Sequence, residues 1–239
     1  MKKISIIIPA YNEEKTIEKV LKSVSLVKIH GYSKEVIVVN DASIDNTKNI
    51  VENFSKNKSF IKLINHEKNM GKGAGISTAL KKITGQIAII QDADLEYDPW
   101  EIPKLVRAYE LNPGCAIFGS RQLNKKNGYS YISYLLGNKL LNFLTNLIYG
   151  IKITDMETCY KLLPASFFKK IRISSTGFEI EPEITAKLAM LGCKIIEVPI
   201  SYKPRSIEEG KKINWVDGIW ALSKLVSVRL FFKPNLKKI

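Results

Sequence analysis

Short apolar runs alternate with amphipathic segments over the first ninety residues of the chain. Four mostly apolar runs predict buried strands over residues 3–9, 36–39, 61–65 and 87–90. The segments between them carry apolar residues at every third or fourth position and predict helices at about residues 13–26, 46–54 and 76–82. Apolar strands that alternate with helices are typical of a parallel sheet covered on both faces. The pattern therefore predicts an α/β fold.

Longer apolar segments appear in the second half of the chain. From 129 to 151 the only charged residue is Lys139, which predicts a helix with a broad apolar face. A helix that begins within 177–183 and a strand at 194–202 follow, and a second apolar helix covers about 215–232. The 129–151 helix is either part of the core or lies in a membrane interface. Its asparagines and a central glycine argue against a helix that spans the membrane.

Acidic residues follow three of the predicted strands. Glu13 comes after the first strand, Asp41 after the second, and Asp92 and Asp94 after the fourth. Because the carboxyl ends of parallel strands share one edge of a sheet, where ligands bind in open α/β folds, we expect these side chains to meet. Carboxylates in such a turn suit Mg²⁺ or Mn²⁺, so we predict a metal held by Asp94 and Glu96 together with substrate phosphates. The alternative is that the acids serve only turns and helix caps.

Charge and composition narrow the possible partners. The 239 residues include 37 Lys and Arg against 23 Asp and Glu, a net charge of +14, which attracts nucleic acid, anionic membranes or phosphorylated substrates. No aromatic and basic readout motif appears, so we expect no nucleic-acid partner. The three cysteines form no CxxC pair and suit the core of a protein in a reducing cytosol. The apolar start of the chain is too short for a signal peptide.

Several motifs stand in an order that resembles family 2 glycosyltransferases. Four of them are Ile-Ile-Pro-Ala-Tyr-Asn-Glu at 7–13, Val-Asn-Asp-Ala-Ser-Ile-Asp at 39–45, Asn-Met-Gly-Lys-Gly at 69–73 and Asp-Ala-Asp at 92–94. Gly-Ser-Arg at 119–121, Thr-Asp-Met-Glu-Thr-Cys-Tyr-Lys at 154–161 and Gly-Phe-Glu-Ile-Glu at 177–181 are similar to the branch that contains dolichol-phosphate mannosyltransferases and polyprenyl-phosphate hexose synthases. The resemblance covers about residues 4–213. It implies a GT-A fold, with a Rossmann-like, mixed and mostly parallel sheet, a divalent metal and a nucleotide-sugar donor.

The resemblance also implies how the chain is organised. Residues 1–239 would form one domain, in which about 1–122 bind the nucleotide sugar, about 123–213 form the acceptor half, and about 214–239 form an amphipathic helix at the membrane. The glycine-rich segment 71–75 would let the backbone approach a ligand closely, with a lysine that neutralises a phosphate. The expected donor-binding residues are Pro9, Tyr11, Glu13, Asp41, Lys72, Asp92 and Ala93.

The expected reaction is the inverting transfer of a hexose from GDP-mannose or a UDP-sugar to a polyprenyl phosphate. A metal on Asp94 and Glu96 would stabilise the charge that develops on the leaving nucleoside diphosphate. The resemblance assigns the acceptor phosphate to Arg121, and Lys125 and Lys126 are further cations for it. A lipid phosphate is already a nucleophile, so it needs cations that position it rather than a base.

Two further catalytic residues leave alternatives open. Arg205 stands in a loop, 203–212, that resembles the mobile loop over the donor pyrophosphate, although a solvated charged loop is the alternative. Asp155 would orient a basic partner if the acceptor is a lipid phosphate. It would instead act as general base if the acceptor is a saccharide hydroxyl, as in the assembly of a cell-surface polysaccharide.

The end of the chain predicts contact with an anionic membrane surface. The helix at 215–232 combines tryptophans and a phenylalanine with lysines at its end, and such a helix suits an anionic leaflet. We therefore expect a cytoplasmic protein that attaches peripherally to the inner face of the cell membrane. The alternative is a terminal helix packed on the sheet with a solvated basic end.

Overall fold

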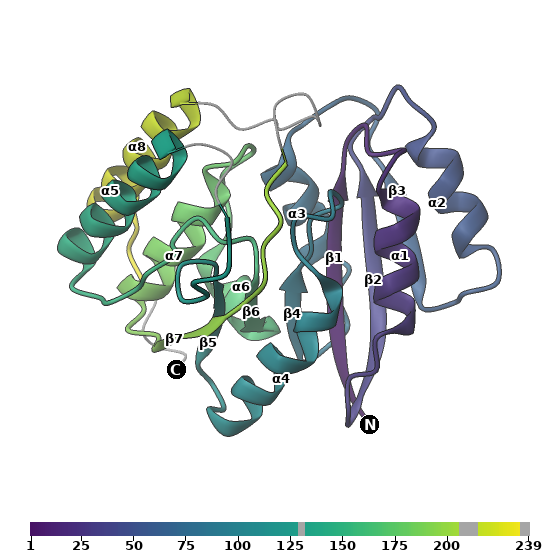
Figure 1. Ribbon diagram of the computed structural model, residues 1–239, viewed down its shortest axis with the longest axis horizontal. Helices are drawn as coiled ribbons and strands as arrows, with labels where there is room; N and C mark the ends of the chain where they lie inside the picture. The colour runs from purple at the N-terminus through teal and green to yellow at the C-terminus, as the bar shows by residue number, and fades with distance from the viewer. Residues whose placement is uncertain (129–131, 206–214, 235–239) are drawn as a thin grey trace.

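The computed structural model describes residues 1–128, 132–205 and 215–234 and is built on one seven-stranded sheet (Figure 1). The strands are β1 (Lys2–Ala10), β2 (Tyr32–Asn40), β3 (Ile61–Asn65), β4 (Ile87–Ile90), β5 (Ala116–Ser120), β6 (Lys161–Pro164) and β7 (Ile195–Pro199). Their order across the sheet is β3-β2-β1-β4-β6-β5-β7. Neighbouring strands pair in parallel, except that β6 runs antiparallel to β4 and β5. The mixed, mostly parallel sheet is as the sequence predicts.

Helices surround this sheet. They are α1 (Ile17–Leu26), α2 (Thr47–Ser55), α3 (Lys72–Leu80), α4 (Ile102–Leu111), α5 (Ile132–Tyr149), α6 (Ala165–Ile171), α7 (Ile180–Met190) and α8 (Trp215–Phe231), with a 3₁₀ turn at Pro99–Glu101. Helix α3 packs on β1 and β2, whereas α4 packs on β5, β6 and β7. Helices α5 and α8 lie side by side at the end of the molecule away from β3 (Figure 1). The predicted C-terminal helix is therefore present.

Two apolar clusters hold these layers together. The larger one joins the buried faces of the strands to the helices on both sides of the sheet. Helix α1 shows the expected pattern, since its buried residues are Ile17, Val20, Leu21 and Val24. The smaller cluster lies beyond the sheet and joins α7 to α8 through Ile153, Met156, Ala186, Leu225 and Val228. It fixes α8 to α7 and to the segment before β6.

Two predicted helix starts were wrong. The first helix begins at Ile17 rather than at Glu13, because a turn precedes it in which the Glu13 carbonyl accepts hydrogen bonds from the Thr16 and Ile17 amides, at 3.1 and 2.9 Å. The third helix begins at Lys72 rather than near Ile76. Its first turn therefore contains glycines that the sequence pattern placed in a loop.

The tight packing of α3 explains those glycines. Gly71 has a φ of +92°, and a Cβ atom there would overlap the Thr176 carbonyl. A Cβ atom on Gly73 would overlap the Ser175 carbonyl, and the Ala74 amide donates a 3.2 Å hydrogen bond to Thr176 O. Gly71 and Gly73 admit the backbone of residues 175 and 176, and the approach of a ligand to this segment stays a prediction.

Candidate active site

Three neighbouring strands deliver acidic residues to one edge of the sheet. Strand β1 is followed by Glu13, β2 by Asp41, and β4 by the turn at 92–96. The strand ends are in register, because Ala10 pairs with Asn40 in the parallel ladder. The acids therefore gather at the carboxyl edge of the sheet, as the sequence predicts.

The guanidinium of Arg205 joins three of these acids. Its Nη2 lies 2.9 Å from Asp94 Oδ2, its Nη1 3.3 Å from Glu13 Oε2, and its Nε 3.6 Å from Glu96 Oε1. The Arg205 amide donates to Glu96 Oε1 at 3.0 Å, and the Tyr202 hydroxyl donates to Glu96 Oε2 at 2.6 Å. The segment that ends in Arg205 therefore closes onto the turn after β4. The rest of the predicted loop, 206–214, lies outside the described residues.

Asp94 stands at the centre of this group of charges. Burial raises the pKa of Asp94 to about 7, and the Asp92 and Glu96 carboxylates add to the shift while Arg205 opposes it. Carboxylates that lie this close together repel one another unless a cation stands between them. The turn after β4 therefore favours a bound cation.

The oxygens of Asp94 and Glu96 fit a divalent metal. They are hard ligands that already point at one cationic group, the guanidinium of Arg205. Within residues 1–128, 132–205 and 215–234, no three His, Cys, Asp or Glu side chains come together as a metal site. Mg²⁺ usually takes one or two carboxylates and completes its shell with substrate phosphates and water. The site therefore suits a metal that is shared with a phosphorylated ligand.

Asp41 holds a loop in place. Its Oδ1 lies 2.7 Å from His66 Nδ1 and accepts a 2.9 Å hydrogen bond from the Met70 amide, and its Oδ2 accepts from the Gly71 amide at 2.7 Å. The other ring nitrogen of His66 lies 2.9 Å from Thr78 Oγ1. Asp41 and His66 are 25 positions apart in the chain, so no local pattern predicts that they pair. Asp41 thus positions the segment that leads into α3.

Lys72 pairs with acids instead of standing free for a phosphate. Its Nζ lies 2.8 Å from Asp92 Oδ1 and 3.3 Å from Glu181 Oε1. Burial alone lowers the pKa of Lys72, but the Asp92 carboxylate and then Cys159 and Glu181 raise it well above its ordinary value. Lys72 is therefore a permanent cation that joins the turn after β4 to α7.

The other predicted donor residues lie on the same edge. Pro9 pairs with Val39 at the end of β1, Tyr11 follows as a half-buried side chain, and Ala93 is buried between the two aspartates. These positions border the carboxylate group from the side of β1 and β2.

Arg121 and Asp155 form a tight pair on the other side of the edge. Asp155 Oδ2 accepts from both the backbone N–H and the Nε of Arg121 at 2.8 Å, and Oδ1 accepts from Nη2 at 2.7 Å. Asp155 is fully buried. Burial opposes the charge on Arg121, but Asp155 raises the pKa of Arg121 well above its ordinary value. Of the two roles open to Asp155, this geometry favours the orientation of a basic partner, because both carboxylate oxygens are engaged.

Lys125 and Lys126 do not join this pair. Both are exposed in the turn after β5, and no ion pair joins either of them to an acid of the described chain. Among the three predicted acceptor cations, Arg121 is therefore the one that the fold buries and orients.

Two charged residues escaped the sequence analysis, although both stand in the motif at 154–161. Lys161 is fully buried, and its Nζ donates to Met156 O and to Glu181 Oε2, each at 2.8 Å. Glu157 interacts electrostatically with that lysine, with Glu181 and with the Arg121–Asp155 pair, and burial raises its pKa to about 7. The sequence signal that could have identified them is the presence of an acid and a lysine within the motif at 154–161.

Helices α5 and α8, which lie side by side (Figure 1), each carry exposed apolar side chains. On α5 they recur at intervals of three or four positions and are Leu136, Leu140, Phe143 and Leu147. On α8 they are Val216, Ile219, Trp220, Leu222, Val226, Leu230 and Phe231. No helix in the described part of the chain is long and apolar enough to cross a bilayer.

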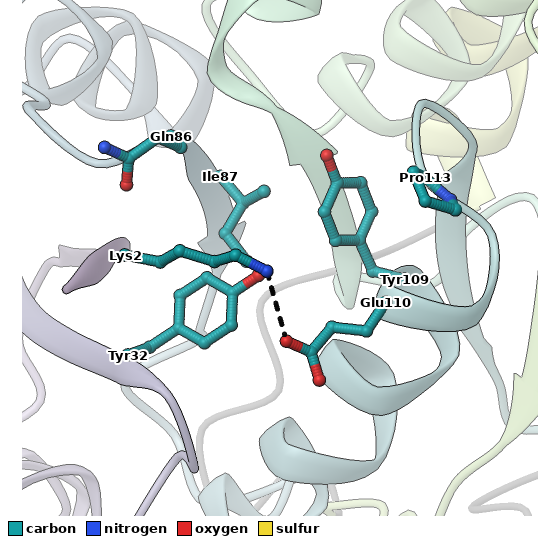
Figure 2. Close-up of a pocket in the computed structure, with 7 residues that line it drawn as sticks. All are labelled: Lys2, Tyr32, Gln86, Ile87, Tyr109, Glu110 and Pro113. Carbon is teal, nitrogen blue, oxygen red and sulfur yellow. Dashed lines mark ion pairs between the residues drawn. The ribbon is translucent and has the colours of Figure 1, made fainter.

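A separate pocket of about 230 Å³ lies at the opposite edge of the sheet (Figure 2). It opens where β1, β2 and β4 begin, and its lining residues are Lys2, Tyr32, Gln86, Ile87, Tyr109, Glu110 and Pro113. A 3.5 Å ion pair between Lys2 and Glu110 crosses it. Both side chains of this pair are largely exposed, and the pocket has no part in the active site.

Comparisons with known proteins agree with this geometry. A family model described as glycosyl transferase family 2 matches residues 5–172. An uncharacterised protein of Methanocaldococcus jannaschii is 34% identical over 203 residues, which are 82% of this chain and 86% of that protein. A dolichyl-phosphate beta-glucosyltransferase of Trichomonas vaginalis is 29% identical and is matched over 99% of this chain and 76% of its own length. A dolichol-phosphate mannosyltransferase of Pyrococcus furiosus is 28% identical over 87% of this chain and 59% of its own length.

Solved structures support the fold. Glucosyl-3-phosphoglycerate synthase from Mycobacterium tuberculosis, crystallised with Mn²⁺, uridine diphosphate and glucosyl-3-phosphoglycerate, superposes with a TM-score of 0.71. The match covers 98% of this chain and 82% of that one, at 18% identity. This chain therefore has the GT-A-like architecture that the sequence predicts.

Proposed function

Because the chain belongs to glycosyltransferase family 2, we propose that it transfers a hexose from a nucleotide sugar to a polyprenyl phosphate, with inversion and with Mg²⁺ or Mn²⁺. Residues 1–122 would bind the donor, and residues 123–213 would form the acceptor half. Two relatives whose names contain a dolichyl or dolichol phosphate support this acceptor class.

The donor diphosphate would lie at the carboxyl edge of the sheet. Asp94 and Glu96 would hold the metal, which neutralises charge on the leaving diphosphate when it is bound. The Arg205 guanidinium stands 2.9 Å from Asp94 Oδ2, close to where the metal and the diphosphate would bind. If it released the carboxylates, it would be placed to contact the diphosphate oxygens. Asp41 would act on the donor through the loop that it orders, since its oxygens hold backbone amides of that loop.

The observation that carries the acceptor assignment is the Arg121–Asp155 pair. A hydroxyl acceptor needs a free base, whereas Asp155 is buried with both oxygens engaged. A phosphate acceptor needs a fixed cation, and Asp155 holds the Arg121 guanidinium in one orientation through two of its nitrogens. The pair therefore favours a phosphate.

The exposed apolar side chains of α5 and α8 suit a substrate that resides in a bilayer. Lys139, Arg229 and Lys233 are exposed on or beside these helices and would contact anionic headgroups. Apolar area that enters the interface and basic residues that meet anionic lipid both strengthen such binding. We propose that this surface attaches the protein peripherally to the inner face of the cell membrane.

Transfer from a panel of radiolabelled nucleotide sugars to undecaprenyl or dolichyl phosphate, with Mg²⁺ or Mn²⁺ in detergent, tests the proposal. We expect a labelled lipid product from which mild acid releases the labelled sugar. The variant Arg121→Gln should lose about a hundredfold or more of this transfer while it still binds the nucleotide. Arg107→Gln, which removes an exposed arginine of α4, is the matched control and should retain it. Donor hydrolysis without a labelled lipid would contradict the acceptor and point to a saccharide hydroxyl.

A further inference from the structure

Glu157 lies within electrostatic reach of two ion pairs. In one, Arg121 is paired with Asp155, and in the other, Lys161 is paired with Glu181. The carboxyl of Glu157 interacts electrostatically with all four of these groups, which come from the end of β5, the segment before β6, β6 itself and α7.

These four charges act in opposite directions on the pKa of Glu157. Lys161 and Arg121 favour its ionised form, while Glu181 and Asp155 disfavour it. Each cation is already neutralised by its own partner, at 2.8 Å for Lys161 and 2.7 Å for Arg121. The loss of water around the carboxyl therefore decides its protonation, and burial raises the pKa of Glu157 to about 7.

The fold leaves one oxygen of the Glu157 carboxyl unsatisfied. Its Oε1 is buried and has no hydrogen-bond partner among the described residues, and the hydroxyl of Thr158 next to it is in the same condition. An unpaired buried carboxylate is costly, whereas a protonated carboxyl needs only an oxygen that accepts its O–H. The described chain supplies no such oxygen to the Glu157 carboxyl, so a bound ligand or a water has to supply it.

Arg121 indicates where that ligand lies. Asp155 takes the Nε and Nη2 of the guanidinium, which leaves Nη1 without a partner in the described part of the chain. A guanidinium nitrogen, a hydroxyl and a carboxyl O–H are all hydrogen-bond donors. A phosphate monoester offers only acceptor oxygens when it is fully ionised, so its chemistry matches this set.

We propose that Glu157 is protonated when the acceptor binds and donates a hydrogen bond to an oxygen of the acceptor phosphate beside Arg121. This inference rests on the proposed function and deepens it, because it gives the acceptor site a neutral donor. At this site the phosphate dianion would contact the Arg121 guanidinium, which Asp155 already pairs, and the uncharged carboxyl of Glu157. Neither group removes a proton from the acceptor.

The transfer step balances without a base. An oxygen of the phosphate dianion forms the new bond to the anomeric carbon, and the bond from that carbon to the diphosphate oxygen breaks with its electron pair on the nucleotide. The lipid product keeps one negative charge, and the proton of Glu157 stays on the carboxyl. A hydroxyl acceptor would instead require an ionised Glu157 to take its proton.

The variant Glu157→Gln tests the inference, because an amide N–H can donate the same hydrogen bond but cannot ionise. For the wild-type protein, the KM for polyprenyl phosphate should rise about tenfold or more between pH 7 and pH 9, as a carboxylate comes to face the phosphate. For Glu157→Gln, KM should stay level over this range and kcat should be retained. Glu18→Gln, on the exposed face of α1, should behave as the wild-type protein does.

Binding of farnesyl phosphate to the Mn²⁺- and nucleotide-loaded protein provides a readout apart from activity. Calorimetry at pH 8 in two buffers of different ionisation enthalpy should show uptake of up to about one proton by the wild-type protein and none by Glu157→Gln. Equal proton uptake, or an equal rise of KM, in the two proteins would overturn the inference. A loss of kcat of about a hundredfold in Glu157→Gln at unchanged KM would also overturn it, because Glu157 would then be a base.

The same experiment separates this inference from the proposed function. If the wild-type protein binds farnesyl phosphate with proton uptake but labels no polyprenyl phosphate, the proposed reaction fails and the role of Glu157 stands. If it binds no phosphate monoester, the inference fails even where transfer to another acceptor is found.

Discussion

Arg205 and a metal ion would compete for the same carboxylate oxygens. The guanidinium lies within 2.9 Å of Asp94 Oδ2 and 3.6 Å of Glu96 Oε1, the two side chains that suit a divalent metal. Both cations cannot hold these atoms at once. A metal that binds with a diphosphate can displace the guanidinium onto the phosphate oxygens, which are also good partners for arginine.

The variant Arg205→Ala should therefore bind Mn²⁺ more tightly than the wild-type protein when no nucleotide is present. Removal of a competing charge-assisted contact at a partly buried site gives about 1 kcal/mol, or roughly fivefold in Kd. Titration followed by the electron paramagnetic resonance signal of free Mn²⁺ measures it. Lys203→Ala removes an exposed cation of the same segment and should leave Kd unchanged. Weaker binding by Arg205→Ala would show that the guanidinium and the metal use different oxygens.

Glu157 should also influence how stability depends on pH. Its pKa is raised from 4.5 to about 7 in the folded protein, mainly by burial, so the folded state holds a proton that the unfolded state releases. Stability from this group is therefore full below pH 4.5 and is lost as the pH rises through 7, by up to about 3 kcal/mol.

Glu157→Gln should remove this contribution. The difference in unfolding free energy between Glu157→Gln and wild type should shift in favour of the variant from pH 5 to pH 8, as measured by urea unfolding. Asp94 has a raised pKa as well, but it is present in both proteins and cancels from the comparison. A difference that stays the same at both pH values would mean that Glu157 is ionised throughout.

At the scale of elements, α3 depends on small residues in its first turn. Its start lies against the backbone of residues 175 and 176, which a Cβ atom on Gly73 would overlap. A Cβ atom on Gly75 would instead make ordinary contacts, 3.6 Å from Pro9 Cβ and 3.7 Å from Val39 Cγ1. Within this turn, the packing therefore requires glycine at position 73 but leaves room for a methyl group at position 75.

Gly73→Ala should destabilise the protein by about 1–3 kcal/mol, because the added methyl forces the helix away from residues 175 and 176. Gly75→Ala should be neutral or stabilise it by up to about 1 kcal/mol, because alanine has the higher helix propensity. Urea unfolding of both variants gives these values. If the two variants were equally stable, the close approach of α3 to this segment would be refuted.

For the whole molecule, the net charge of +14 and the exposed apolar side chains of α5 and α8 both favour binding to a membrane that contains anionic lipid. Leu147 on α5 is 69% exposed, and Leu111 on α4 is 74% exposed but lies on a different element. Leu111 therefore serves as the control for Leu147, because both are exposed leucines but only Leu147 lies on the α5 and α8 surface.

Leu147→Glu should weaken binding to vesicles that contain anionic lipid by about tenfold, because it places a charge in the apolar surface that enters the interface. Leu111→Glu should leave this binding unchanged. Cosedimentation with vesicles of phosphatidylglycerol and phosphatidylcholine measures both. An equal effect of the two substitutions would indicate general electrostatic attraction rather than a docking face on α5 and α8.

The sequence by itself determined the parallel half of the fold. The apolar runs that became β1, β2 and β4 are mostly buried, and β3 is a partly exposed run at the edge of the sheet, so the number of these strands and their order along the chain follow from periodicity. The acids after them could be placed at one edge for the same reason. The pattern analysis assigned no element to residues 98–120 or 161–171, where β5, β6, α4 and α6 lie, because these elements are short and their burial depends on distant partners.

Only the tertiary structure decided which charges meet. Arg205 reaches Asp94 across 111 positions and Arg121 reaches Asp155 across 34, and no local pattern encodes such pairs. The same holds for Glu157, which differs from its neighbour Asp155 because it has no partner for its buried oxygen. The sequence thus specified where strands end and which residue types stand there. The packing of residues 121–205 against the sheet specified their partners and their burial, and these set their protonation and the chemistry that each can perform.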